Sequence, residues 1–297
     1  MFPPRPPAHR RLSLLLAGLG AAACAGAQMQ AVAASRMPMP RRPRSGIETV
    51  TIQSGSGSAL RAWLMRGIPG KGAVLLFHGI GSDRTSMLAR AAFLHDDGYT
   101  VLAPDFQAQG ESPGAHVTYG ARESLDAAAA FKLLRDTLPN ELVGVIGVSM
   151  GGAAALLGPG PLKANAFVLE SVYPTIADAV SDRLESWFWP LGEVGRSLAP
   201  ALIGFVGSNV GVTEAELQPI DRIGHLGAPV LMLAGTDDPY TPLAEAESLY
   251  ARAAEPKMFW AIRGAKHEDF YAFSPSEYER RIGAFFAQYL RRRAPAE

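Results

Sequence analysis

The chain has 297 residues, of which 48% are hydrophobic and 19% are charged, so it can bury one sizeable core. Its 28 basic and 28 acidic residues cancel to a net charge of zero, so no strong overall field would draw it to nucleic acid. We therefore expect a single folded domain and no nucleic-acid partner.

The first 24 residues are typical of an export signal. Three arginines, Arg5, Arg10 and Arg11, precede an uncharged apolar run over 12–23 that is too short to span a bilayer comfortably. The chain's one cysteine, Cys24, follows directly, which predicts either a lipidated first residue or cleavage at a small-residue site. We expect an exported protein, periplasmic or secreted or anchored as a lipoprotein, that contacts a membrane only through this segment or a lipid on Cys24.

The folded domain is expected over residues 47–293. Residues 25–46 are rich in Ala, Met, Pro and Arg without apolar periodicity, which predicts a flexible linker. Two strands, 48–53 and 60–66, flank a Ser-Gly-Ser-Gly turn and predict an N-terminal hairpin.

After the hairpin, short apolar runs alternate with longer helical patterns. This alternation predicts an α/β fold with a mostly parallel central sheet and helices on both faces. An aromatic-rich insertion at about 172–220 predicts a small helical cap. The expected strands are 73–77, 100–103, 143–148, 166–169, 230–234 and 258–262, and the expected helices are 87–95, 121–135, 243–254 and 275–292.

A Gly-x-Ser-x-Gly pattern, residues 147–151, closes the buried run that ends at Val148. Glycines around a serine leave room for a sharp, strained turn from strand to helix, and the amides at the start of that helix favour an oxyanion. The pattern predicts that Ser149 is a nucleophile, although a glycine-rich turn that merely contains serine has the same sequence.

Four further loops follow predicted strands. They read Phe-His-Gly-Ile-Gly over 77–81, Pro-Asp-Phe-Gln-Ala-Gln-Gly-Glu-Ser over 104–112, Gly-Thr-Asp-Asp-Pro-Tyr-Thr-Pro over 235–242, and Gly-Ala-Lys-His-Glu-Asp-Phe over 264–270. With the serine turn, they resemble the H-G-x-G, D-x-R-G-x-G-x-S, G-x-x-D-x-x-x-P and G-x-x-H loops of the α/β-hydrolase family, and the resemblance covers about residues 47–293. Gln107 and Ala108 depart from the second pattern, so the anchoring of that loop is left open.

The resemblance implies a role for each matching residue. Ser149, Asp238 and His267 follow the family's order of nucleophile, acid and base, and the backbone amides of Ile80 and Met150 would form the oxyanion hole. Two other acids stay open: Asp237 if its loop is shifted by one residue, and Glu170 at the end of another strand. The first histidine of the constellation, His78, is interpreted as a structural hydrogen-bonding residue rather than a base.

No other motif indicates a bound group. The remaining histidines lack metal-like spacing, and no Gly-x-Gly-x-x-Gly or Walker-type loop follows a strand, so we expect no metal and no cofactor.

The sequence thus predicts an exported serine hydrolase that cleaves carboxylic esters through an acyl-enzyme, with a small acyl compound as its substrate. Within the family it looks most like the Bem46-like and serine-aminopeptidase-like hydrolases. A thioesterase, a peptidase or an acyltransferase would use the same residues, and a non-catalytic binding protein on the same fold is the alternative from another class. Oligomeric state is left open.

Overall fold

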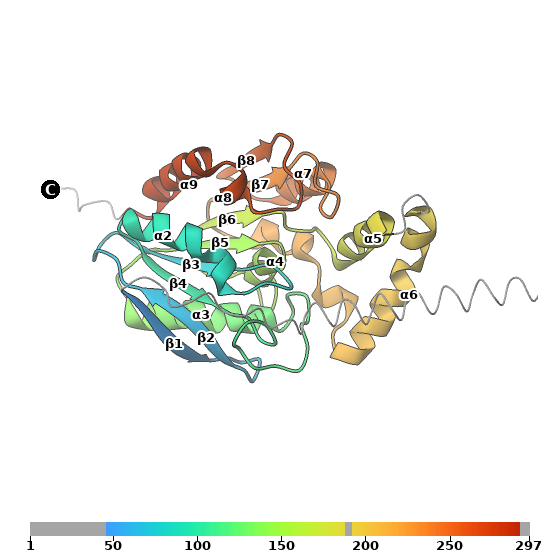
Figure 1. Cartoon of the computed structure of the whole chain (residues 1–297), viewed down its shortest axis with the longest axis horizontal. Helices are drawn as coiled ribbons and strands as arrows, with labels where there is room; N and C mark the ends of the chain where they lie inside the picture. Colours follow the sequence, from blue (N-terminus) through green and yellow to red (C-terminus); the bar gives the residue numbers. More distant parts are fainter. Residues whose placement is uncertain (1–45, 188–191, 292–297) are drawn as a thin grey trace, which may run out of the picture.

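The computed structural model of the chain describes residues 46–187 and 192–291 (Figure 1). The expected export segment with Cys24, nearly all of the expected linker, and the C-terminal residues from Arg292 on lie outside the described residues. Part of the expected cap, 188–191, does so too.

One sheet of eight strands forms the centre of the domain, in the order β1-β2-β4-β3-β5-β6-β7-β8. β1 and β2 form the expected antiparallel hairpin, β2 pairs antiparallel with β4, and the other neighbours are parallel. The mostly parallel α/β fold predicted from the sequence is therefore confirmed. The strands are β1 (Ile47–Gln53), β2 (Ala59–Met65), β3 (Ala73–Phe77), β4 (Thr100–Pro104), β5 (Val143–Val148), β6 (Ala166–Glu170), β7 (Val230–Gly235) and β8 (Lys257–Ile262).

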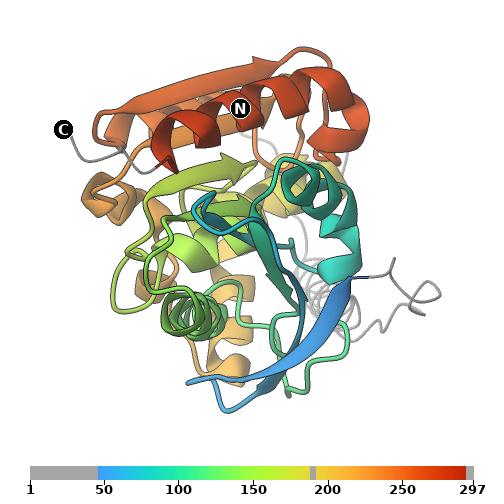
Figure 2. The same cartoon turned by 90° about the vertical axis from the view of Figure 1, so that its left-hand side faces the viewer.

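Helices cover both faces of this sheet, which explains why its central strands are continuous apolar runs. In β3, Leu75 and Phe77 join one core while Val74 and Leu76 join the other, as the two-residue period of a strand requires. Figure 2 shows α2 and α3 on opposite sides of the sheet. Helices α3 (Glu123–Thr137), α4 (Met150–Leu156) and α7 (Leu243–Arg252) pack on the first face, and α2 (Leu88–Asp96), α8 (Phe270–Phe273) and α9 (Pro275–Tyr289) on the second.

The insertion between β6 and β7 contains two packed helices, α5 (Ile176–Trp187) and α6 (Gly192–Val210), followed by short 3₁₀ turns. They lie beside the sheet on the right of Figure 1. Apolar residues of both helices, among them Val180, Leu184 and Leu202, join the core of the first face. We call α5 and α6 the cap.

Element bounds differ from the sequence-based expectation by one to three residues, and the differences of two or three residues are at helix ends. α3 begins at Glu123 rather than at residue 121, because the Glu123 carboxylate accepts hydrogen bonds from the Thr118 and Gly120 amides and holds the preceding turn. α2 begins one residue late because a 3₁₀ turn, Arg84–Met87, precedes it, with the Asp83 side chain capping that turn.

Candidate active site

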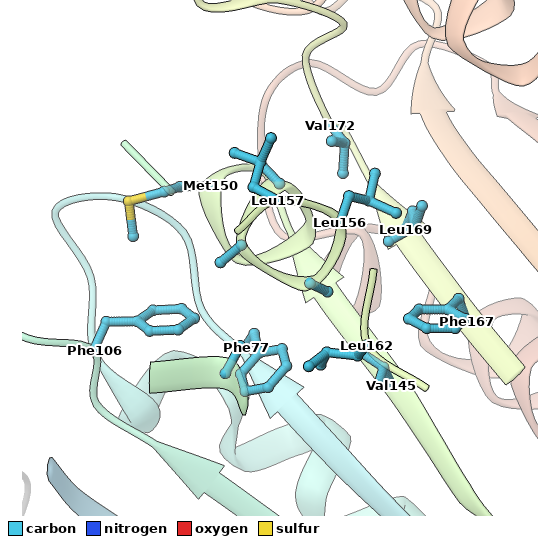
Figure 3. Close-up of a cluster of buried hydrophobic side chains, with 14 of the residues drawn as sticks. Phe77, Phe106, Val145, Met150, Leu156, Leu157, Leu162, Phe167, Leu169 and Val172 are labelled. Atoms are coloured by element: carbon cyan, nitrogen blue, oxygen red, sulfur yellow. The ribbon is translucent and has the colours of Figure 1, made fainter. Parts of the chain in front are cut away.

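Ser149 lies at the turn between β5 and α4 with φ +49° and ψ −117°, a backbone conformation that is costly for a residue with a side chain. Neighbouring glycines allow it. A Cβ at Gly147 would lie 2.5 Å from the Cα of Gly152, and one at Gly151 would lie 2.4 Å from the carbonyl oxygen of Phe77. Helix α4 is thus held tightly against β3 and β5, and Figure 3 shows the apolar side chains that surround it.

The loop after β3 is held by its own side-chain contacts. His78 is fully buried; its Nδ1 lies 2.8 Å from the Gly79 carbonyl oxygen, and its Nε2 lies 3.1 Å from the Phe106 amide nitrogen. The carbonyl can only accept and the amide can only donate, so the ring is neutral with its proton on Nδ1. Burial lowers the pKa of His78, in accord with that neutral form. His78 is therefore a structural residue.

A side chain from another loop fixes the same segment. The Gly81 amide donates to Gln109 Oε1 over 2.8 Å, immediately after Ile80. The amides of Ile80 and Met150 have no hydrogen-bond acceptor among the described residues. The Met150 side chain is buried in the same apolar cluster as Phe106 (Figure 3), so only its backbone could face a substrate.

Asp238 and His267 form a pair at the ends of β7 and β8. His267 Nδ1 lies 2.8 Å from Asp238 Oδ2, which also accepts from the Ser171 hydroxyl over 3.1 Å. The other oxygen of Asp238 accepts from the amides of Tyr240 and Thr241 over 2.8 and 3.0 Å. The acceptor-only carboxylate places the imidazole proton on Nδ1 and leaves Nε2 as an acceptor.

The two other carboxylates considered as the acid have other partners. Asp237 is exposed, and its carboxylate accepts from the Thr236 hydroxyl. Glu170 is 1% exposed, and its oxygens lie 3.1 and 2.7 Å from Arg90 Nε and Nη2 and also accept from the Tyr278 hydroxyl. Of the three acids, Asp238 is the one hydrogen-bonded to His267.

The loop over 104–112 is anchored by an arginine from elsewhere in the chain. Where the family pattern has an arginine, Gln107 bonds instead to Glu123 and the His116 carbonyl oxygen. The buried guanidinium of Arg84 binds the carboxylate of Asp105, which also accepts from the Arg84 and Glu111 amides. Ala108 takes the place of the pattern's glycine at φ +59°. The loop therefore keeps its anchoring although two of its residues depart from the pattern.

A cavity of about 390 Å³ joins these elements. Ser149, His267, Ile80 and Glu170 all line it, so the structure brings most of the predicted site residues to one place. Asp238 lies behind His267 and is 5% exposed. The volume is in the usual range of small-molecule sites.

Two arginines that line this cavity were not anticipated: Arg90 in α2 and Arg183 in α5. One signal was available for Arg90, since a charged residue on the apolar side of a predicted helix needs a buried partner. Nothing in the sequence near Arg183 distinguishes it from an ordinary surface arginine of a helix.

Over the ranges 46–187 and 192–291, no cluster of His, Cys, Asp and Glu is arranged to hold a metal ion. In the same part of the chain, no helix combines the length and the apolar character needed to cross a membrane.

Comparisons with known proteins agree with this architecture. Residues 69–198 match the family model described as serine aminopeptidase, S33. The chain is 26% identical over 220 residues to the uncharacterized protein YqkD of Bacillus subtilis, covering 71% of this chain and 70% of that one. It is 27% identical over 222 residues to an uncharacterized protein of Mycobacterium tuberculosis, covering 74% and 72%.

Among solved structures, an esterase of Pyrococcus furiosus superposes with a TM-score of 0.70 at 24% identity, over 86% of this chain and 96% of the esterase. That likeness concerns the fold, and the stretch that matches the family model contains the serine turn. Sheet order, serine turn and superposition agree, and the chain has the α/β-hydrolase fold.

Proposed function

We propose that this protein is a serine hydrolase that cleaves carboxylic esters of small acyl compounds, with Ser149 as nucleophile, His267 as base and Asp238 as acid. The observation that carries the proposal is the 2.8 Å hydrogen bond between Asp238 and His267. His267 lines the same cavity as Ser149, whose backbone has a positive φ. Similar solved structures include esterases, which supports an ester substrate.

In the first half of the reaction, Ser149 Oγ attacks the carbonyl carbon of the ester while its proton passes to His267 Nε2. The backbone amides of Ile80 and Met150 donate to the oxyanion that forms. The tetrahedral intermediate collapses, the bond to the leaving oxygen breaks, and His267 returns its proton to that oxygen. The products are an alcohol and an acyl-Ser149 ester.

In the second half, water attacks the acyl-enzyme and gives its proton to His267. Collapse of the second intermediate releases the carboxylic acid and returns the proton to Ser149 Oγ. Asp238 keeps the tautomer with Nε2 free and stabilises the imidazolium, helped by the Ser171 hydroxyl and the Tyr240 and Thr241 amides, which hold the carboxylate in place.

The test is a substrate panel on protein lacking residues 1–24: p-nitrophenyl esters of increasing chain length, a matched thioester and a matched aminoacyl anilide. We expect the highest kcat/KM for a short ester and loss of turnover in Ser149→Ala. A preference for the thioester or the anilide would change the substrate class, because the same three residues serve all of them. No turnover of any substrate by folded wild type would refute the function.

We also propose that the protein is exported, as the first 24 residues predict. The mass of the mature N-terminus tests this. Removal of the segment with diacylglycerol on Cys24 indicates a lipoprotein, removal without lipid indicates a periplasmic or secreted protein, and an intact Met1 contradicts export.

A further inference from the structure

Two guanidinium groups line the cavity, and within the described residues only that of Arg90 is in an ion pair. Arg90 is almost fully buried and lies against three oxygen-bearing side chains: Glu170 at 2.7 Å, Asp269 at 2.7 Å and the Tyr278 hydroxyl at 3.1 Å. Two carboxylates against one cation leave Arg90 no charge to offer a substrate.

Arg183, on the cap helix α5, has no such partner. Its Nη1 donates to the Ala179 carbonyl oxygen over 3.0 Å, and its guanidinium carbon lies 5.2 Å from the centroid of the Tyr240 ring. No carboxylate of the described residues lies within ion-pair distance of it. Most of its donors therefore have no acceptor among the residues that the structure describes. Burial is the main cause that lowers its pKa, while Asp238 and Asp182 act in the opposite direction without forming an ion pair.

The carboxyl group next to it in sequence is engaged elsewhere. Asp182 faces Glu245 of α7, and one oxygen of each, Oδ2 and Oε2, is buried without a donor among the described residues. Two carboxyl groups that face each other out of water share a proton. The Asp182–Glu245 pair thus holds less negative charge than two free carboxylates, and it makes no ion pair with Arg183.

Arg183 also lies close to the reacting groups. The Tyr240 ring against which its guanidinium stacks stands edge-on to the His267 imidazole, with ring centroids 5.6 Å apart. One aromatic ring therefore separates the unpaired cation from the base. A ligand group bound by Arg183 would belong to a substrate that also reaches His267.

We infer that Arg183 binds a carboxylate carried by the substrate, so that the preferred esters are anionic. This inference rests on the proposed ester hydrolysis and names its substrate class. A guanidinium presents paired donors that match a carboxylate, and in a partly enclosed site such a pair is worth more than one at an open surface. The same cation disfavours the ammonium group of a free amino acid ester or an N-terminal peptide.

The experiment compares two pairs of isosteric esters, because the carboxylate could sit on either part of the substrate. One pair differs in the acyl group: p-nitrophenyl hydrogen adipate and the p-nitrophenyl ester of the branched alkanoic acid of equal shape. The other differs in the alcohol: the acetate of p-hydroxyphenylacetic acid and the acetate of p-isobutylphenol. For each pair the readout is the ratio of kcat/KM, charged over neutral.

In wild type this ratio favours the charged ester in at least one pair, and Arg183→Gln lowers it about 10- to 100-fold, as expected for a hydrogen-bonded ion pair. Arg183→Lys keeps the positive charge but lacks the paired donors of the guanidinium, so it lowers the ratio less. Arg135→Gln removes the same charge from the exposed face of α3 and leaves the ratio unchanged. Free adipate inhibits wild type competitively, and hexanediol of equal length does not.

Equal ratios in wild type and Arg183→Gln for both pairs, with no inhibition by adipate, would overturn the inference. Failure of wild type to hydrolyse even the neutral esters would instead refute the proposed function, so the two failures are distinct. The adipate measurement needs no variant and stands if Arg183→Gln does not fold.

Discussion

The sheet body and the cap differ in how their buried charges are paired. In the body, Arg84 lies against Asp105 and Glu111, and Arg90 lies against Glu170 and Asp269. On the cap, Arg183 stacks on an aromatic ring without an ion pair among the described residues.

The difference separates two tasks. Matched charges hold the loops around Ser149 and His267 in place before any substrate arrives, which is what preorganised catalysis requires. A charge on the cap that has no ion-pair partner among the described residues is stabilised when a ligand or a proton binds. We therefore assign positioning of the chemistry to the body and choice of substrate to the cap.

The largest expected effect tests the assignment of the acid. Asp238→Asn should lower kcat for the preferred ester by about 10⁴-fold, because an amide can favour the wrong imidazole tautomer. Glu170→Gln, which changes a carboxylate paired with Arg90, should lower kcat far less. Steady-state kinetics of both variants decides which carboxylate is the acid. Near-normal turnover in Asp238→Asn together with loss in Glu170→Gln would transfer the acid role to Glu170.

The next largest effect tests the difference in charge pairing between the two arginines of the cavity. Arg90→Met leaves the carboxylate of Glu170 buried without its cation and should lower the free energy of unfolding by about 3–5 kcal/mol. Arg183→Met removes a cation that forms no ion pair among the described residues, and the free energy should change by about 1 kcal/mol or less. Urea unfolding of both variants measures this. Equal losses would show that Arg183 is also paired.

The smallest effect concerns the carboxyl pair between the cap and α7. Burial, and after it the neighbouring Asp182, raises the pKa of Glu245 to about 9. The folded protein therefore holds a proton that the unfolded chain has released above pH 5, so stability falls as pH rises from about 5 to 9. Asp178 and Asp238 add to this repulsion.

Glu245→Gln should remove this dependence, because the amide donates to Asp182 without titrating. Thermal unfolding from pH 5 to 9 should show wild type losing about 1–2 kcal/mol more than the variant, once the partial exposure of Glu245 is allowed for. Parallel curves for the two proteins would mean that the carboxyl groups do not share a proton.

Much of this arrangement could be read from the sequence. Buried parallel strands are continuous apolar runs, so β3 and β5 were predicted at their observed bounds. The Gly-x-Ser-x-Gly turn was predictable because it depends on local space: at Gly147 and Gly151 a side chain would collide with backbone. The loop pattern also favoured Asp238 over Asp237, and Asp238 is the one hydrogen-bonded to His267.

The pairing of the buried charges could not be predicted from local sequence patterns. Arg90 and Glu170 are 80 positions apart, and Arg84 lies on a turn 21 positions before Asp105. Only the sheet order brings these segments together, so the sequence left Glu170 open as an alternative to Asp238 for the acid. Arg183 was missed for the same reason, since its place in the cavity depends on how the cap packs on the body.

The central claim is that Ser149 is an activated nucleophile beside His267. A fluorophosphonate probe tests it directly, with mass spectrometry to locate the label. We predict that wild type is labelled on Ser149, that Ser149→Ala is not labelled, and that His267→Ala is labelled far more slowly. A folded wild type that stays unlabelled, or a label that persists in Ser149→Ala, would contradict the claim.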